Sequence, residues 1–453
     1  MMRLRALTRS DLGRRLALAT VSSGIIWAAG TAATFAVGVL LARRLGPAGY
    51  GVYGTAIAIV TLLAVPAQFG LPLLSTREVS AARVRGRADE VAALGWWFAA
   101  IVAGASLFLA GGLRLANDVL PLAPPIRPAI AAAALLLPAL ALSGLTSGLL
   151  RGRERVITSQ LLDVLIRPLV FVAALLAWSQ PLGPSQAIGA QVVAAGTIAL
   201  IGFVLFFRGL PLTMSGGAVR LRTWSAAAFP MTLMEAMRAL EGSYAVLVAS
   251  YVASIADAGL LRVAIASSVI LQLPISLQNI VTAPFLAGAH AAGETRRLAQ
   301  IVAASTLFMT GGVAAVLIVL AVAGRWALPF AFGQGFAGAY VPLMILGGNQ
   351  LLSAMIGPNI MLLSMTGHER IVAQAFIASV LAGVATAAVL TPIFGVTGTA
   401  ASTWVVTAIR GVLLNRHARQ TLGLSPSLLA AIGQFSRHGG SARPDAASGR
   451  GGL

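Results

Sequence analysis

The sequence contains neither cysteine nor lysine, and few of its residues are charged. Without cysteine, a disulfide framework and a thiolate metal site are both excluded. The four histidines have no metal-binding spacing, so the sequence predicts no metal centre and no cofactor. Charged residues make up 10% of the 453 residues, where a soluble domain has about 25%, and 58% are hydrophobic. This composition excludes a disordered chain and argues against a soluble one.

Long apolar runs recur from residue 16 to residue 414, and short arginine-containing turns separate them. A helix needs about twenty apolar residues to cross a hydrocarbon core of about 30 Å. The runs are continuously apolar rather than alternating, which favours helices over a membrane β-barrel. We therefore predict an all-α polytopic membrane protein with about twelve transmembrane helices. The expected spans are 16–42, 50–74, 91–113, 127–150, 156–178, 185–207, 225–250, 256–286, 298–323, 339–365, 370–392 and 396–415.

The formal net charge is +19, and all 32 basic residues are arginines, which gather at the ends of the apolar runs. Aromatic residues do not alternate with them, so the sequence predicts no nucleic-acid partner. Cytoplasmic loops of membrane proteins carry an excess of arginine. This rule places both termini in the cytoplasm, because few arginines then face the opposite side. Those few are Arg43, Arg44, Arg114, Arg127, Arg262 and Arg325.

An internal repeat divides the chain into two halves. Gly51 and Pro66 match Gly259 and Pro274, and the segment LLRGRERV matches SMTGHERI at a similar spacing. Both halves then cross the membrane in the same direction, which predicts two parallel-related six-helix bundles around a central cavity. The expected parts are a basic cytoplasmic N-terminal segment (1–15), an N-terminal bundle (16–210), a cytoplasmic linker (211–224), a C-terminal bundle (225–416) and a disordered cytoplasmic tail (417–453).

Two stretches of sequence resemble a known family of transporters. LLARRLGPAGYGVYGTAIAIVTLLAVPAQFGLPLLSTREVS (Leu40–Ser80) and FGQGFAGAYVPLMILGGNQLLSAMIGPNIMLLSMTGHER (Phe332–Arg370) are similar to polysaccharide flippases of the multidrug/oligosaccharidyl-lipid/polysaccharide exporter superfamily. The resemblance covers most of residues 16–416. It implies movement of lipid-linked oligosaccharides from the cytoplasmic to the outer leaflet of a bacterial inner membrane.

Charged residues inside the expected spans are candidate substrate- or ion-binding groups, because a charge at mid-bilayer costs roughly 2.5–3.5 kcal/mol and usually faces a cavity or a partner. Glu235, Arg238 and Glu241 recur every three residues in the seventh span and share one helix face. Asp163 and Arg167 lie four residues apart in the fifth span, where an ion pair is also expected. Packing of either group against a neighbouring helix is the structural alternative.

Two further pairs are candidates for a gate. Arg43 and Arg44 lie at the expected outer end of the first span, against the general arginine bias, which suggests an outer gate or an interface anchor. Pro66 and Pro274 occupy equivalent positions of the repeat. Each removes a backbone hydrogen bond and permits a kink, which can serve gating or static packing.

The favoured hypothesis is a monomeric, non-enzymatic transporter that flips a polyprenyl diphosphate glycan by alternating access, for cell-surface polysaccharide biosynthesis. Membrane lipids surround it, and H⁺ or Na⁺ is a candidate coupling ion. A cation-coupled exporter of drugs or other small molecules, with the same fold, is the first alternative. An integral-membrane glycan polymerase or ligase is the second, although the short outer loops offer few acid or base groups for such chemistry.

Overall fold

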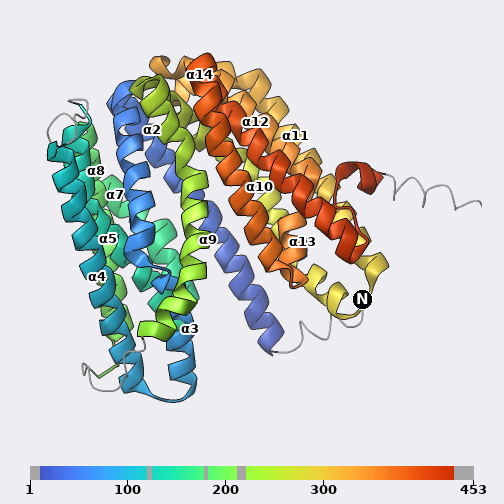
Figure 1. Ribbon diagram of the computed structural model, residues 1–453, viewed down its shortest axis with the longest axis horizontal. Coiled ribbons are helices and arrows are strands. Elements are labelled where there is room, and N and C mark those ends of the chain that lie inside the picture. Colours follow the sequence, from blue (N-terminus) through green and yellow to red (C-terminus); the bar gives the residue numbers. More distant parts are fainter. Residues whose placement is uncertain (1–10, 120–124, 178–181, 212–220, 433–453) are drawn as a thin grey trace, which may run out of the picture. The chain divides into compact units, whose positions relative to one another are not determined.

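Helices form every regular element of the computed structural model, which describes residues 11–119, 125–177, 182–211 and 221–432 (Figure 1). The predicted all-α fold is therefore confirmed for these residues. The helices of the first half are α2 (Asp11–Gln68), α3 (Leu71–Val84), α4 (Ala88–Val119), α5 (Arg127–Gly152), α6 (Val156–Gln160), the π-helix η1 (Leu161–Ile166), α7 (Arg167–Leu176) and α8 (Pro184–Phe207).

The second half continues the pattern, with long apolar helices joined by short turns. Its elements are α9 (Leu221–Val248), the π-helix η2 (Ala249–Ala253), α10 (Ile255–Ala291), α11 (Thr295–Phe332), the 3₁₀-helix η3 (Gln334–Ala339), α12 (Tyr340–Ile356), α13 (Asn359–Met365) and α14 (Glu369–Leu422). Helices α9, α10, α11 and α14 are longer than the apolar runs that predicted them.

The two longest helices, α2 and α14, each consist of two arms joined at a glycine. Gly46 and Gly395 have φ values of 64° and 60°, which glycine adopts without steric cost. In α14 the hydroxyls of Thr391 and Thr399 lie 2.9 Å apart across the break, a separation that a straight helix does not allow. The α14 chain therefore turns sharply at Gly395, and α2 and α14 each supply two of the predicted spans.

Nine helices among the described residues are long and apolar enough to cross a membrane. Two of these candidates, Ile26–Val84 and Glu369–Leu422, contain the arms just described and therefore count twice. Helix α9 is long enough as well, but the charged side chains of the predicted seventh span lower its hydropathy. Together these helices account for the about twelve predicted crossings.

Three predicted spans differ from the observed helices: two contain a break, and one is shorter than its helix. The second span, expected at 50–74, breaks at Phe69, a non-glycine residue with a positive φ of 43°. The tenth, expected at 339–365, breaks between α12 and α13 at Gly357, whose φ is 88°. The predicted C-terminal bundle ends at residue 416, whereas the last helix extends to Leu422. Beyond that helix, the carbonyl of Pro426 accepts a hydrogen bond from the hydroxyl of Thr306. Residues 1–10, most of the linker and residues 433–453 lie outside the described ranges.

The chain separates into two compact units, of which unit 1 combines segments from both sequence halves and unit 2 comes from the second half alone. Unit 1 comprises Met1–Ser267, Gly324–Leu343 and Val384–Ala401, and unit 2 comprises Ser268–Ala323, Met344–Gly383 and Ser402–Leu453. In unit 1, α5 packs against α3, α4 and α8, and Figure 1 shows α4, α5 and α8 side by side. In unit 2, a buried leucine cluster that includes Leu286, Leu298 and Leu414 forms the main core.

Candidate functional site: a polar cavity and a closed end in unit 1

Asp163 lies in η1, the π-helix that interrupts the fifth predicted span. Pro168 follows five residues later and cannot donate the backbone hydrogen bond that a regular helix needs at that position. A wider π-turn just before a proline relieves this mismatch, and π-turns inside α-helices frequently mark functional sites. The sequence showed the proline but not the π-turn that carries the acid.

A cavity of about 450 Å³ opens beside the broken end of α2. Four helical elements supply its polar side chains, which include both signs of charge. They are Gln68 from α2, Ser147 and Arg151 from α5, Asp163 from η1, and Glu235 and Arg238 from α9. We call this group the polar cavity. It brings together candidates from the fifth and seventh predicted spans, which are far apart in the sequence.

Hydrogen bonds fix one wall of the polar cavity. The hydroxyl of Ser147 donates to a carboxylate oxygen of Asp163, and the guanidinium of Arg151 donates to the Ser147 carbonyl at 3.1 Å. A carboxylate that accepts a hydrogen bond in a half-buried place is held in a defined orientation. Asp163 is therefore a positioned acid at the boundary between α5 and η1.

The opposite wall carries a loosely paired acid and base. Arg238 Nε lies 4.0 Å from Glu235 Oε2, and the two side chains are 71% and 58% exposed. An ion pair this long and this open contributes little to stability, so both groups retain capacity for a ligand. Glu241, the third member of the predicted cluster, is not among the described residues that line the cavity, although it makes other contacts.

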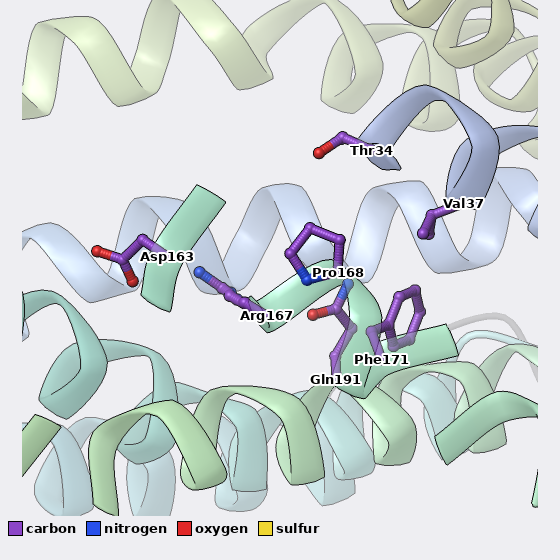
Figure 2. Close-up of a pocket in the computed structure, with 7 residues that line it drawn as sticks. All are labelled: Thr34, Val37, Asp163, Arg167, Pro168, Phe171 and Gln191. Atoms are coloured by element: carbon purple, nitrogen blue, oxygen red, sulfur yellow. The ribbon is translucent and has the colours of Figure 1, made fainter. Parts of the chain in front are cut away.

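A second, smaller cavity of about 230 Å³ shares Asp163 with the first (Figure 2). Arg167 and Pro168 line it from α7, Thr34 lines it from α2, and Gln191 from α8 faces them. Among the described residues, Asp163 and Arg167 form no ion pair within 4.0 Å, and the acid accepts a hydrogen bond from Ser147. The expected ion pair between these two residues is therefore not observed.

A line of polar contacts continues from the smaller cavity. The Gln191 amide donates to the hydroxyl of Tyr53 at 3.1 Å. The guanidinium of Arg262 lies over the rings of Tyr50 and Tyr53, at 5.6 Å and 5.3 Å from their centres. Sequence reasoning treated Arg262 only as a charge on the outer side and missed Gln191 and both tyrosines. Polar side chains within apolar spans were the signal that could have found them.

The other end of the second α2 arm is closely packed. Gly51 and Gly259, the residues matched by the internal repeat, contact each other's helix backbone, and a Cβ on either would collide with a backbone carbonyl. Small residues permit such close helix crossings in membrane proteins. The ring of Tyr50 packs edge-on against Phe336 at a centre distance of 6.2 Å. We call this region, which includes Arg262, the closed end.

Arg43 forms hydrogen bonds between the closed end and α11, whereas Arg44 does not. The Arg43 guanidinium donates to the carbonyls of Phe330 and Ala331, the latter at 2.6 Å, and so caps the last turn of α11. Arg44 is exposed and makes no hydrogen bond or ion pair with any described residue. The two candidates for an outer gate therefore have different surroundings.

The two candidate kink prolines also lie in different surroundings. Pro66 is in the last turn of α2, just before the break at Phe69. Pro274 lies within α10 and packs against Gly312 of α11. A shared gating role for this pair remains a prediction.

Arginines in the turn after α5 cap a neighbouring helix. Arg155 donates to the carbonyl of Leu205 at 2.8 Å, and Arg153 donates to those of Phe206 and Arg208, all at the end of α8. Burial lowers the pKa of Arg153, and the charges of Arg155 and Arg83 lower that pKa further. These arginines, expected only to set the membrane orientation, thus also stabilise the helix end.

The lining of the polar cavity combines charged and neutral hydrogen-bonding groups. No group of three metal-ligating side chains occurs within the ranges that the structure describes. Two guanidinium groups and two carboxylates surround the cavity, together with hydroxyl and amide groups. Such a lining can bind a polar headgroup through both charged and neutral hydrogen bonds.

Comparison with known proteins assigns the sequence to a family. A family model described as "Polysaccharide biosynthesis protein" matches residues 21–290, more than half of the chain. The chain belongs to this family. No curated protein sequence matches it significantly.

Solved structures of membrane transporters share the fold. An inward-facing MATE multidrug resistance transporter of the MOP superfamily has a TM-score of 0.73 at 12% identity, with 94% of this chain and 100% of that chain covered. The lipid II flippase MurJ in an inward closed conformation has a TM-score of 0.69 at 10% identity, with 94% of each chain covered. A MOP superfamily transporter from Pyrococcus furiosus has a TM-score of 0.58 at 14% identity, with 92% and 97% covered.

These comparisons confirm the family resemblance and the fold class. The chain is a multi-pass membrane protein of the polysaccharide biosynthesis family with the fold of MOP superfamily transporters. The predicted arrangement in two bundles agrees with these neighbours.

Proposed function

We propose that this protein is a transporter, not an enzyme, that moves a lipid-linked oligosaccharide from the inner to the outer leaflet of a bacterial inner membrane. The observation that carries this proposal is the polar cavity, in which charged side chains from α5, η1 and α9 surround one space inside an apolar helical unit. The family assignment and the fold of MurJ, a lipid II flippase, support the same conclusion.

The cargo needs such a cavity because its sugars and phosphates cannot cross hydrocarbon unaided. Each unpaired polar group costs several kcal/mol in an apolar environment. Arg151 and Arg238 provide positive charge for a diphosphate, and Glu235, Gln68 and Ser147 provide acceptors and donors for sugar hydroxyls. The polyprenyl tail remains in the surrounding lipid.

The two ends of the second α2 arm fit one state of an alternating-access cycle. The polar cavity lies at the predicted cytoplasmic end of this arm, and the closed end lies at its predicted outer end. In this proposal the state is inward-facing, Asp163 takes part in coupling to H⁺ or Na⁺, and both termini are cytoplasmic. An inside-negative potential favours outward movement of an anionic headgroup by about 2.3 kcal/mol per charge per 100 mV.

Replacement of Arg238 by Ala tests the function. We expect at least a tenfold loss of translocation in an assay of leaflet accessibility, with unchanged abundance in the membrane. Arg297→Ala is the matched control, because Arg297 also follows a glutamate by three residues but pairs with Glu294 at 2.9 Å outside the cavity. Equal translocation by both variants would remove Arg238 from the mechanism.

Export of a small cationic or neutral molecule is the second candidate function, and the MATE fold favours it. The carboxylates Glu235 and Asp163 would then bind the cargo or the coupling cation. Counterflow in proteoliposomes separates the two functions, because a drug exporter exchanges labelled drug without a lipid-linked glycan.

A further inference from the structure

Unit 2 contains a groove of about 630 Å³ that shares no residue with the polar cavity. It lies between the end of α12 and the second arm of α14. Leu352, Ile356 and Val412 line its apolar part, and Asn415, Arg416 and Arg419 line its polar part. We call it the lateral groove.

The two parts of the lateral groove correspond to two depths of a membrane. Arg416 follows the break at Gly395 by about 30 Å of helix, at 1.5 Å per residue, which is the thickness of a hydrocarbon core. Arg416 and Arg419 therefore lie at the interface, and Val412 lies about one turn deeper. Val412 is 66% exposed, so this part of the groove faces away from the packed core of unit 2.

The charge of the lateral groove is uncompensated by the protein. No acidic residue lines it. Arg416 makes no hydrogen bond or ion pair with any residue in the described part of the chain, and Arg419 binds the neutral hydroxyl of Ser425 at 3.0 Å. Two adjacent guanidinium groups above an apolar surface are complementary to an anion that carries a hydrocarbon chain.

The groove has two neutral polar side chains, Asn415 and Gln420, and Asn415 is already hydrogen-bonded. The Asn415 amide donates to the carbonyl of Ile356 at 3.3 Å, and its oxygen accepts a hydrogen bond from Asn359 at 3.2 Å. The Gln420 amide is then the one neutral side chain of the lining that is left for sugar hydroxyls, so the two guanidinium groups dominate the binding chemistry of the groove.

We propose that the lateral groove binds an anionic phospholipid of the surrounding bilayer. Arg416 and Arg419 bind the phosphate, and one acyl chain lies along Leu352, Ile356 and Val412. This site differs from the cargo site in ligand, in residues and in compact unit.

Binding of phosphatidylglycerol to the full-length protein in neutral detergent tests this proposal. We expect native mass spectrometry to show retained phosphatidylglycerol but not phosphatidylcholine. We also expect phosphatidylglycerol to raise the unfolding temperature of the wild type more than phosphatidylcholine does. Equal retention and equal stabilisation by the two lipids would overturn the proposal, and this comparison needs no variant.

Variants then assign the site. Arg416→Ala with Arg419→Ala should weaken phosphatidylglycerol binding at least tenfold, while Arg416→Lys with Arg419→Lys should retain most of it. Arg370→Ala is the control, because Arg370 is an exposed arginine outside the groove. Unchanged binding by the double alanine variant would overturn the site. So would displacement of phosphatidylglycerol by polyprenyl diphosphate at equal concentration, because the groove would then belong to the cargo path.

Discussion

The two ends of the second arm of α2 differ in packing and in polarity. Near Gly51 the arm contacts α10 backbone to backbone, and the ring of Tyr50 packs edge-on against Phe336. Near Gln68 the helix breaks, and charged side chains surround a cavity of about 450 Å³. Close packing of glycines closes one end, and charged side chains line the cavity at the other.

This difference indicates how one helix can serve both a seal and a binding site. Close packing of small residues is specific, because a single added side chain separates the helices. A polar wall tolerates changes in spacing better, since ligands or water can satisfy its groups. Substitutions at the closed end should therefore change the conformational equilibrium, and those at the polar cavity should change binding.

Gly51→Leu should have the largest effect. The added side chain would collide with the backbone at Ile255, and overpacking of this kind costs about 1–3 kcal/mol or more. We expect transport to fall more than tenfold. A single Thr55→Cys thiol should also become accessible to a membrane-impermeant reagent, because Thr55 is buried in the closed end and the chain has no other cysteine.

Gly104→Leu is the control for this prediction, since a Cβ on Gly104 meets no atom within 4 Å. Transport by this variant should remain near that of the wild type. If Gly51→Leu also transports normally, the close crossing plays no part in the cycle.

Variants of Asp163 and Ser147 should distinguish the effect of the Asp163 charge from that of its hydrogen bond. Asp163→Asn keeps an acceptor for Ser147 but removes the charge, so we expect transport to fall about tenfold while the unfolding temperature stays close to that of the wild type. Ser147→Ala removes the donor and leaves the carboxylate unsatisfied, which should lower the free energy of unfolding by about 1–3 kcal/mol. Full transport by Asp163→Asn would assign Asp163 a structural role alone.

Arg43→Ala should loosen the closed end by a smaller amount. The loss of two hydrogen bonds to the end of α11 is worth about 1–2 kcal/mol, which corresponds to a roughly 5- to 30-fold shift in the opening equilibrium. Labelling of the Thr55→Cys thiol measures that shift. Arg44→Ala should leave it unchanged, and equal labelling in both variants would remove the distinction between these neighbours.

Much of the fold could be predicted from the sequence, because apolar runs of about twenty residues have few structural solutions in a membrane. The pairing of Gly51 with Gly259 was visible as a repeat, although not as a contact. The candidate site could be predicted only in part. Asp163, Glu235 and Arg238 were conspicuous because charge is costly in lipid, and they do line one cavity.

The missed residues share a physical cause. Ser147 and Arg151 carry no unusual signal in the sequence, because serine is common within membrane helices and an arginine at a helix end is expected from topology. Their role follows from the approach of α5 to Asp163, a contact between helices that a single sequence does not reveal. Similarly, the position of Arg262 over two tyrosines depends on how α10 crosses α2.

Arg262→Gln should give the smallest effect in this series. A cation–π contact at a partly exposed site contributes about 0.5–1 kcal/mol, so opening of the closed end should increase roughly two- to fivefold. Arg325→Gln is the matched control, because Arg325 lies over Tyr340 at 5.2 Å, outside the α2–α10 crossing. If the Thr55→Cys thiol is labelled equally in both variants, the Arg262 contact contributes nothing specific to the closed end. The close crossing of Gly51 and Gly259, together with Arg43, would then account for the closure.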